Sequence, residues 1–179
     1  GHFPAGTVID DPVNNTDWVP TLLELAGVPV PPGLDGTSFA QGLQGGTIPA
    51  APLFWHFPPY TNQGSRPSGA MRDGNWLLVE MYDEDVTELY DLSVDIGEQH
   101  HIAAQHPERA AAMKASLAAY RKANNVQYNQ PNPDCDEPLY RALYVDTDVS
   151  QFRPDEADDQ AWQRVHEWRR GMDKAVEGL

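Results

Sequence analysis

Short apolar runs separated by turn signals are concentrated between Leu53 and Leu92. The runs cover residues 53–57, 69–72, 75–82 and 86–92. Asp73-Gly74, between the second and third runs, is typical of a type I′ hairpin turn, in which both central residues adopt positive φ. A second, acidic turn lies at 83–85. The pattern predicts an antiparallel meander in which 69–72 is a brief, edge-like run, and such a sheet needs a helix on one face for stability.

A short helix is predicted over Asp17–Ala26. Residues 14–17 are all favoured at a helix N-cap, and Pro20 falls in the first turn, where its missing N–H costs little. Gly27 is well placed to end the helix, because glycine readily adopts the left-handed conformation that follows a last turn. Trp18, Leu22 and Leu25 recur at helical spacing and form an apolar face.

Two longer helices are predicted further along the chain, over 107–124 and 155–177. The first has Pro107 at its start and is expected to cover one face of the meander with a stripe of Ala112, Met113, Leu117 and Tyr120. The second carries acidic residues at its N-terminus, as the helix dipole prefers. Its expected packed face consists of Trp162, Val165, Trp168 and Met172.

The remaining segments are expected to be irregular, apart from small elements. Single helical turns are predicted at 38–43 and 139–144, and a short strand at Val8-Ile9 within an N-terminal loop. Residues 126–138 are polar and interrupted by prolines, which indicates an excursion over the surface. The whole pattern predicts an α+β fold: a small antiparallel β-sheet of about four strands packed by a long helix. Three regions are expected, at 1–50, 51–125 and 126–179.

Composition narrows the function classes. The chain has 179 residues with 12 Lys+Arg against 27 Asp+Glu, a net charge of −15. Nucleic acid and anionic membrane are therefore not expected as partners, because both require clustered cations. One cysteine excludes a disulfide scaffold and a cysteine-rich zinc site. No apolar run approaches the roughly 20 residues that span a bilayer. The absence of an initiator Met suggests a fragment or a processed chain.

Two groups of motifs resemble the C-terminal part of type I (formylglycine-dependent) sulfatases. Asp17–Pro29 is similar to the family's D-x-x-P-T-L-L-x-L-A-G-x-P, and Leu34–Ser38 to its L-D-G-x-S. Arg72–Val79 is similar to R-x-G-x-x-K-L-I, with Leu77 where relatives usually have Lys. Glu88–Leu92 and Asp95–Glu98 are similar to E-L-Y-D-L and D-x-x-E. The resemblance runs from about residue 1 to residue 124.

The resemblance implies a parent enzyme, arylsulfatase-like, that hydrolyses sulfate esters of a sulfated carbohydrate, with this segment forming part of the wall of the substrate cleft. In that family a formylglycine made from the Cys or Ser of C-x-P-S-R attacks sulfur, and a calcium ion neutralises the developing charge. The nucleophile motif does not occur in this chain, and Cys135 lacks its proline and arginine. The resemblance thus implies that 1–50 ends an alkaline-phosphatase-like α/β catalytic domain with its last helix, that 51–125 is the C-terminal sheet and helix, and that 126–179 is an extended tail with a terminal helix.

Further expectations follow from the resemblance alone. The segment carries no catalytic or metal-binding residue and is expected to be inactive by itself, while calcium and formylglycine belong to the parent enzyme. The expected partners are the missing N-terminal sulfatase domain and a sulfated carbohydrate substrate. A periplasmic or secreted location is expected.

The candidate substrate-binding residues are His56, Tyr60, Arg66 and Arg72. Aromatic rings stack on sugars, and histidine and arginine can meet hydroxyl, carboxylate or sulfate groups. Trp55 and Phe57 are instead expected in the core. Arg72, beside the hairpin, is expected to pair with an acid of the sheet or to reach the cleft.

Other clusters are given ordinary roles. Residues 83–85 are expected to be a solvated turn, because the spaced ligand pattern of an EF-type calcium loop is absent. His100, His101 and His106 lack the partners of a zinc site. Asp146 and Asp148 are expected at the surface. Two alternatives to the sulfatase segment remain: a stand-alone sulfated-glycan-binding module and a structural remnant that is unstable without its partner domain.

Overall fold

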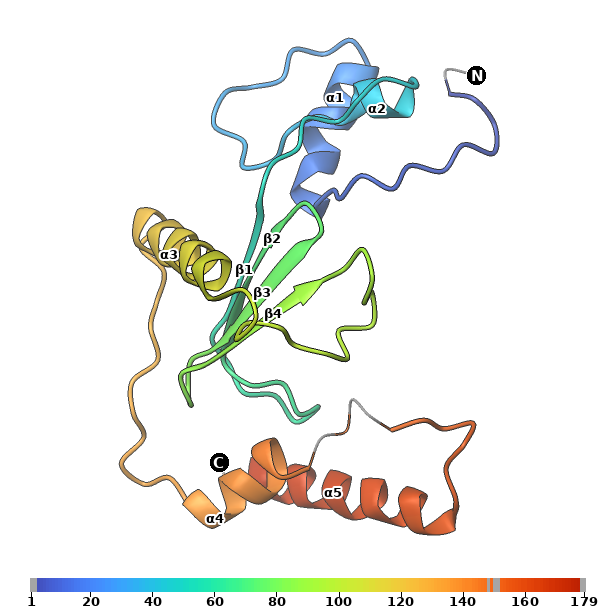
Figure 1. Cartoon of the computed structure of the whole chain (residues 1–179). Helices are drawn as coiled ribbons and strands as arrows, with labels where there is room; N and C mark the ends of the chain where they lie inside the picture. Colours follow the sequence, from blue (N-terminus) through green and yellow to red (C-terminus); the bar gives the residue numbers. More distant parts are fainter. Residues whose placement is uncertain (1–2, 148, 150–151, 178–179) are drawn as a thin grey trace. The chain divides into compact units, whose positions relative to one another are not determined.

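The computed structural model describes residues 3–147, 149 and 152–177 (Figure 1). Asp148, expected at the surface, and residues 1–2, where the resemblance begins, lie outside this part. The chain divides into two compact units. The first runs to Leu53 and includes Arg72–Trp76, and the second comprises Phe54–Met71 and the chain from Leu77.

The elements follow one another in the predicted order. They are η1 (Asn15–Asp17), α1 (Trp18–Leu25), α2 (Ala40–Leu43), β1 (Leu53–Phe57), β2 (Ser68–Asp73), β3 (Trp76–Met81), β4 (Val86–Asp91), α3 (Pro107–Ala123), α4 (Glu137–Tyr140), η2 (Arg141–Val145) and α5 (Asp159–Glu177). The α+β prediction is confirmed. The short strand predicted at Val8-Ile9 is wrong, since both residues lie in irregular chain.

The first unit is organised around two side chains of the first motif. The Asp17 carboxylate accepts hydrogen bonds from the backbone N–H groups of Asn14 (2.7 Å) and Thr37 (2.8 Å). Thr21 is fully buried; its hydroxyl donates to the Asp17 carbonyl (2.6 Å) and accepts from the Phe39 N–H (3.0 Å). The D-x-x-P-T motif therefore holds the L-D-G-x-S segment against the start of α1.

Helix α1 ends as predicted. Gly27 has φ +68°, and the N–H groups of Gly27 and Val28 donate to the carbonyls of Glu24 and Leu23. This is the paired bonding of a Schellman cap. Trp18 and Leu22 on the expected apolar face remain 48% and 57% exposed.

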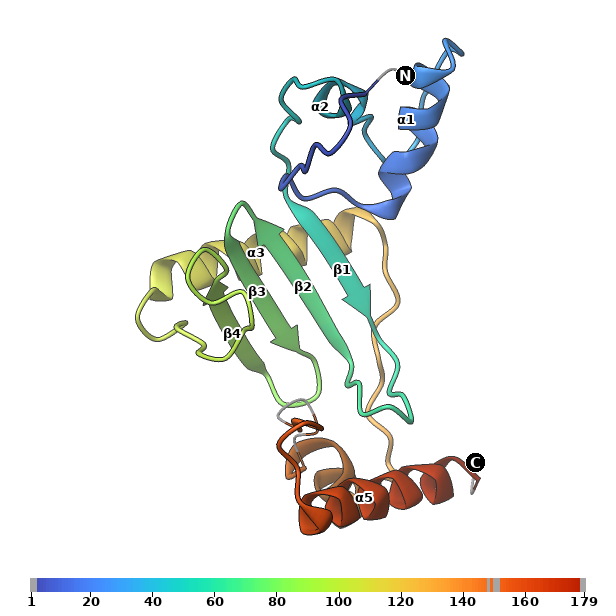
Figure 2. The ribbon, with the colours of Figure 1, turned by 90° about the vertical axis from the view of Figure 1, so that its right-hand side faces the viewer.

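The four strands form one antiparallel sheet in the order β1-β2-β3-β4 (Figure 2). The edge-like reading of residues 69–72 is wrong, because β2 pairs with a strand on each side. The predicted type I′ turn at Asp73-Gly74 is also wrong. Asp73 still belongs to β2, and the turn consists of Gly74 and Asn75, of which only Gly74 has positive φ (+57°). Positive φ at the first central residue alone is the pattern of a type II′ turn.

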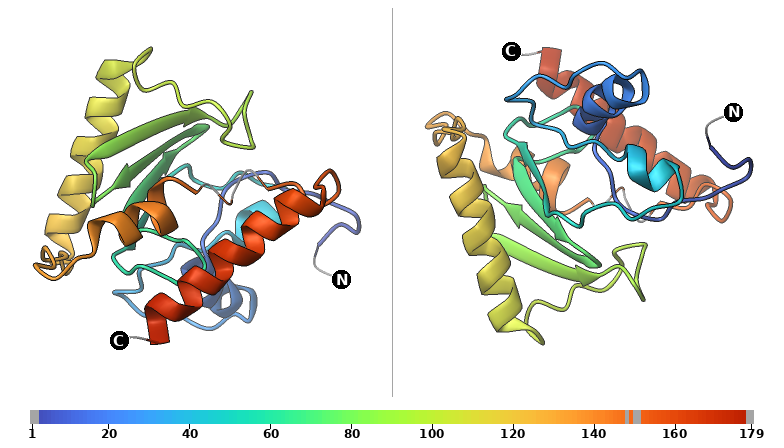
Figure 3. Two further views of the ribbon diagram at one scale, coloured as in Figure 1. Left: turned by 90° about the horizontal axis from the view of Figure 1, so that it is seen from below. Right: turned by 90° about the horizontal axis from the view of Figure 1, so that it is seen from above.

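Helix α3 covers one face of the sheet, as predicted (Figure 3). Its buried residues are Ala110, Met113, Leu117 and Arg121, and Tyr120 stacks on Phe54 of β1 with ring centroids 4.4 Å apart. Ala112, predicted in this stripe, is exposed because the buried face continues through Ala110 instead.

A charged pair also lies between α3 and the sheet. Arg121 Nη2 is 2.9 Å from Oε2 of Glu80 on β3, and both side chains are only 10% exposed. The Arg121 guanidinium also lies over the Tyr82 ring, 4.8 Å from its centroid.

The opposite face of β1 is open. Trp55 and Phe57 are 42% and 41% exposed, so the expectation that they lie in the core is wrong. Strand alternation explains this result: Phe54 and His56 point to the side of α3, and their neighbours must point to the other side.

The helices of the tail pack against one another within the second unit (Figure 3). Trp168 of α5 donates its indole N–H to the Leu143 carbonyl of η2 (2.9 Å), and Met172 is fully buried. Helix α5 begins at Asp159 rather than at 155, because the Asp158 carboxylate accepts the Ala161 N–H (2.7 Å) and so caps the helix there. Trp162, predicted on the packed face, is 39% exposed. None of the described helices is both long and apolar enough to cross a bilayer.

Candidate functional site

An arginine and two acids from separate loops form the centre of the site. Arg66 Nε donates to Asp83 Oδ2 (3.1 Å) and Arg66 Nη2 to Asp83 Oδ1 (2.8 Å), a two-point contact. The same Nη2 lies 2.9 Å from Glu84 Oε2. The Arg66 and Asp83 side chains are 14% and 11% exposed. The prediction of a solvated 83–85 turn is therefore wrong for Asp83, whereas Asp85 is 91% exposed.

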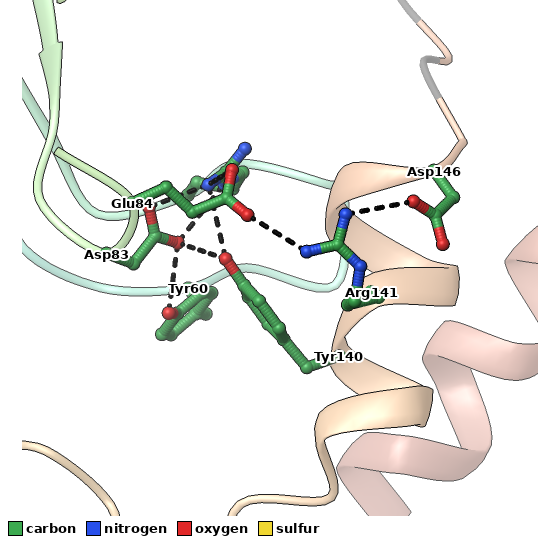
Figure 4. Close-up of polar contacts among 7 residues, drawn as sticks. Tyr60, Asp83, Glu84, Tyr140, Arg141 and Asp146 are labelled. Carbon is green, nitrogen blue, oxygen red and sulfur yellow. Dashed lines mark hydrogen bonds and ion pairs between the residues drawn. The ribbon is translucent and has the colours of Figure 1, made fainter. Parts of the chain in front are cut away.

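Two tyrosines also donate hydrogen bonds to the Asp83 carboxylate (Figure 4). The hydroxyls of Tyr60 and Tyr140 both donate to Oδ2, at 3.1 and 2.9 Å. Arg141 lies between Glu84 and Asp146, 3.4 Å from a carboxylate oxygen of each. We call this group the Asp83 cluster; its members are Tyr60, Arg66, Asp83, Glu84, Tyr140 and Arg141.

The cluster shifts the pKa values of Asp83 and of the two tyrosines that contact it. Burial by itself would raise the pKa of Asp83, but hydrogen bonds from Arg66 and Tyr140 outweigh it and hold that pKa below its ordinary value. Burial and the hydrogen bond to Asp83 raise the pKa of Tyr140 to about 12, and the pKa of Tyr60 is raised for the same reasons. At neutral pH the site therefore contains a carboxylate held by a cation and by two neutral phenols.

A groove of about 520 Å³ adjoins the cluster. It is lined by the tyrosines Tyr60, Tyr82, Tyr140 and Tyr144, by the segment 129–132, and by the acids Asp83 and Glu137. We call it the tyrosine groove. All of its lining residues belong to the second unit.

His56 lies beside these groups without joining the Asp83 cluster. Its Nδ1 is 2.9 Å from the Tyr82 hydroxyl and its Nε2 is 3.0 Å from the Gln127 carbonyl. A neutral imidazole can donate to only one of the two, and the carbonyl can only accept. Nε2 therefore carries the proton, and Nδ1 accepts from Tyr82.

Arg72 lies in the first unit. Its Nε donates to the Gly74 carbonyl (2.9 Å), within its own hairpin. Among the ion pairs of the described residues none includes Arg72, so the predicted pairing with an acid of the sheet is wrong. The residue lines a hollow of about 580 Å³ together with Asp10 and Asp11.

The structure thus brings together two of the four predicted site residues, Tyr60 and Arg66. Asp83 and Tyr140 were missed. The partners of Asp83 are 17, 23 and 57 positions away in the chain, and no motif links them. Substrate binding by the four predicted residues stays a prediction.

The site offers no ready place for a metal ion. Within residues 3–147, 149 and 152–177, no group of three or more His, Cys, Asp or Glu residues could hold one. Asp83 and Glu84 already face Arg66, which satisfies their charge. The calcium ion implied by the resemblance therefore does not fit the described residues.

The family model for the C-terminal part of N-sulphoglucosamine sulphohydrolase matches residues 1–123. This match covers the first unit, the sheet and α3, and ends before the connection, residues 124–136, that leads to α4.

Individual relatives agree with the family match. A sulfatase of Formosa agariphila is 28% identical over 158 residues, which is 75% of this chain and 29% of that protein. An N-acetylglucosamine-6-O-sulfatase of Bacteroides thetaiotaomicron is 28% identical, over 67% of this chain and 22% of that protein.

A solved structure is also similar. It is a protein in complex with its substrate D-glucosamine-2-N,6-O-disulfate; the identity is 27% and the TM-score 0.51, over 59% of this chain and 23% of that one. The chain spans less than a third of the length of these relatives. The chain belongs to the N-sulphoglucosamine sulphohydrolase C-terminal family and corresponds to the C-terminal part of sulfatase-family proteins.

Proposed function

We propose that the protein containing this chain hydrolyses sulfate esters of a sulfated carbohydrate, and that this segment forms part of the wall of its substrate cleft. The observation that carries the proposal is the family match over residues 1–123. The names of the relatives support a sugar substrate, since one is an N-acetylglucosamine-6-O-sulfatase and another was solved with a sulfated glucosamine.

Catalysis in this proposal belongs to a partner part of the protein. The C-x-P-S-R motif is absent from the sequence, and Cys135 is an exposed thiol followed by Asp136. The described residues offer no calcium site. Formylglycine and calcium would therefore be supplied by an N-terminal sulfatase domain, and this segment alone would be inactive. Export to the periplasm or the outside of the cell is proposed on the family resemblance.

The four candidate substrate-binding residues differ in which ring faces and charges remain free to contact a substrate. Tyr60 is 44% exposed, so its ring is open to a sugar although its hydroxyl is used. The charge of Arg66 is balanced by two carboxylates, which weakens it as a sulfate ligand. Arg72 has no carboxylate partner among the described residues, and its charge remains available for sulfate. His56 offers a ring whose two nitrogens are both engaged, one with Tyr82 and one with the Gln127 carbonyl.

The test compares the native protein with the isolated chain. Peptide mapping of the protein from its source is expected to find a C-x-P-S-R peptide with formylglycine at its first position. The native protein should release sulfate from sulfated glucosamine oligosaccharides, and the 179-residue chain should release none. Arg72→Ala in the native protein should raise KM more than it lowers kcat, because it removes a binding group.

Two results would overturn the proposal. One is sulfate release by the isolated chain at the rate of the native protein. The other is a native protein that contains no formylglycine peptide and releases no sulfate; sulfate-dependent binding by the isolated chain would then identify a glycan-binding module.

A further inference from the structure

We propose that the tyrosine groove is a binding site for an uncharged sugar residue, separate from the group that loses sulfate. The choice of a glycan as ligand rests on the proposed function, whereas the choice of an uncharged residue rests on the groove itself. Its volume of about 520 Å³ lies within the range of small-molecule sites.

The apolar surface of the groove consists of fixed aromatic rings. The Tyr60 ring lies 5.0 Å from Tyr144 and 6.0 Å from Tyr140, centroid to centroid, and both pairs pack edge to face. Each hydroxyl is held: those of Tyr60 and Tyr140 by Asp83, and that of Tyr144 by the Thr61 carbonyl (3.2 Å). Rings that are already ordered lose little entropy on binding, and their faces suit the C–H surface of a sugar.

Amide groups on the 129–132 segment supply the polar contacts. Asn129 donates its Nδ2 to the Pro58 carbonyl (2.6 Å), and the Asn132 Oδ1 accepts the Asp134 N–H (3.0 Å). These bonds fix both side chains and leave the Asn129 Oδ1 and the Asn132 Nδ2 without a partner among the described residues. A free acceptor oxygen on one amide and a free donor nitrogen on the other match the paired hydrogen-bonding character of sugar hydroxyls.

The charge of the groove excludes an anionic ligand. Its charged lining residues are Asp83 and Glu137, and no Lys, Arg or His is among the described residues that line it. Two arginines contact lining residues, and each already faces a carboxylate: Arg66 faces Asp83 and Glu84, and Arg121, over the Tyr82 ring, faces Glu80. A sulfate group would meet carboxylates without a compensating cation, so the sugar residue in this groove carries no sulfate.

The site is built mostly by the tail. Most of its lining comes from residues 129–144, beyond the family match that ends at residue 123. It would therefore select among glycans by the unsulfated residue that accompanies the sulfated one.

The first measurement is calorimetry of the chain with a matched pair of probes, the hexasaccharide of N-acetylglucosamine and its 6-O-sulfated derivative. The uncharged probe should bind, and the sulfated probe should bind at least about tenfold more weakly. Absence of binding by the uncharged probe, or tighter binding of the sulfated one, overturns the inference.

Protection of Cys135 from alkylation tests whether the probe binds in the groove. It is the only cysteine of the chain, it is exposed, and it lines the groove. The uncharged probe should slow alkylation of Cys135 by iodoacetamide in proportion to its occupancy. Binding that leaves the alkylation rate unchanged would place the sugar elsewhere and overturn the inference.

Variants provide the matched control. Gln130→Trp places a bulky ring at the groove and should abolish binding, whereas Gln44→Trp, at an exposed position after α2, should leave it unchanged. Equal binding by the two variants overturns the inference. Sulfate release by the native protein tests the proposed function separately, because failure of the groove would leave the sulfate-releasing reaction intact.

Discussion

Arg66 and Asp83 meet side by side, with Nη2 2.8 Å from Oδ1 and Nε 3.1 Å from Oδ2. Such a two-point contact fixes the orientation of both side chains as well as their separation. Through Asp83 the pair also fixes Tyr60 on the β1–β2 loop and Tyr140 on α4. One ion pair therefore determines where two rings of the tyrosine groove lie.

Removal of the arginine should cost substantial stability. Arg66→Met leaves the Asp83 carboxylate, 11% exposed, without its cation, and the free energy of unfolding should fall by about 3 kcal/mol. The control is Arg141→Met, because Arg141 is 46% exposed and its contacts are 3.4 Å long, so that its loss should be below about 1 kcal/mol. Urea unfolding of the three proteins gives the comparison, and similar losses in the two variants would contradict this account of the cluster.

The Asp83 cluster should make stability depend on pH on the acid side. The pKa of Asp83 is lower in the folded chain than its ordinary value, so the folded state favours the ionised form. This stabilisation is fully present above the unfolded pKa of about 4 and is lost as pH falls through the folded value. Asp83→Asn should therefore be clearly less stable than the natural chain at pH 6, and the difference should shrink below pH of about 4. Urea unfolding across this range provides the measurement, and a constant difference would exclude the linkage.

The charged pair under α3 should be replaceable as a pair but not singly. Glu80 Oε2 and Arg121 Nε have no hydrogen-bond partner among the described residues, so the 2.9 Å contact of Glu80 with Arg121 Nη2 is an ion pair without good hydrogen-bond alignment. Arg121→Met alone should cost about 3 kcal/mol, because it leaves a buried carboxylate with only Lys114 nearby. Adding Glu80→Leu should recover most of this loss. A double-mutant cycle measures the coupling, and additive losses would argue against it.

The L-D-G-x-S segment should not accept a side chain at its glycine. A Cβ on Gly36 would overlap the carbonyl of Thr16, and backbone there cannot move without stretching the 2.8 Å bond from Thr37 to Asp17. Gly36→Ala should cost about 1–3 kcal/mol and speed hydrogen exchange at the Thr37 amide. Gly97→Ala is the control, since its Cβ would meet only Gln99 at an ordinary 3.6 Å. Unchanged exchange at Thr37 in Gly36→Ala would contradict this role of the glycine.

Local chemistry was sufficient to predict most of the elements. Pro107 at the start of α3 and the glycine that follows α1 each act on the chain beside them, and both predictions are confirmed. The errors at the hairpin were small in sequence: the turn was displaced by one residue, and its type changed with it.

Burial and the site depended on contacts that local chemistry does not contain. Trp55 and Phe57 are as apolar as core residues, but strand alternation opposite Phe54 turns them outward. The sequence predicted that Asp83 belongs to a solvated turn, because the residues that donate hydrogen bonds to it come from a different loop and from the tail. Only tertiary packing could reveal that this carboxylate is nearly buried.

The Asp83 cluster joins two stretches of chain. Arg66 and Asp83 lie inside the family match, and Tyr140 and Arg141 lie beyond it. A tail exchanged between sulfatases would have to bring its own phenol to the same carboxylate. The two parts of a chimera joined within residues 126–136 would therefore be compatible only when both parent proteins share this pairing. Asp83 is the single position at which the two parents have to be matched.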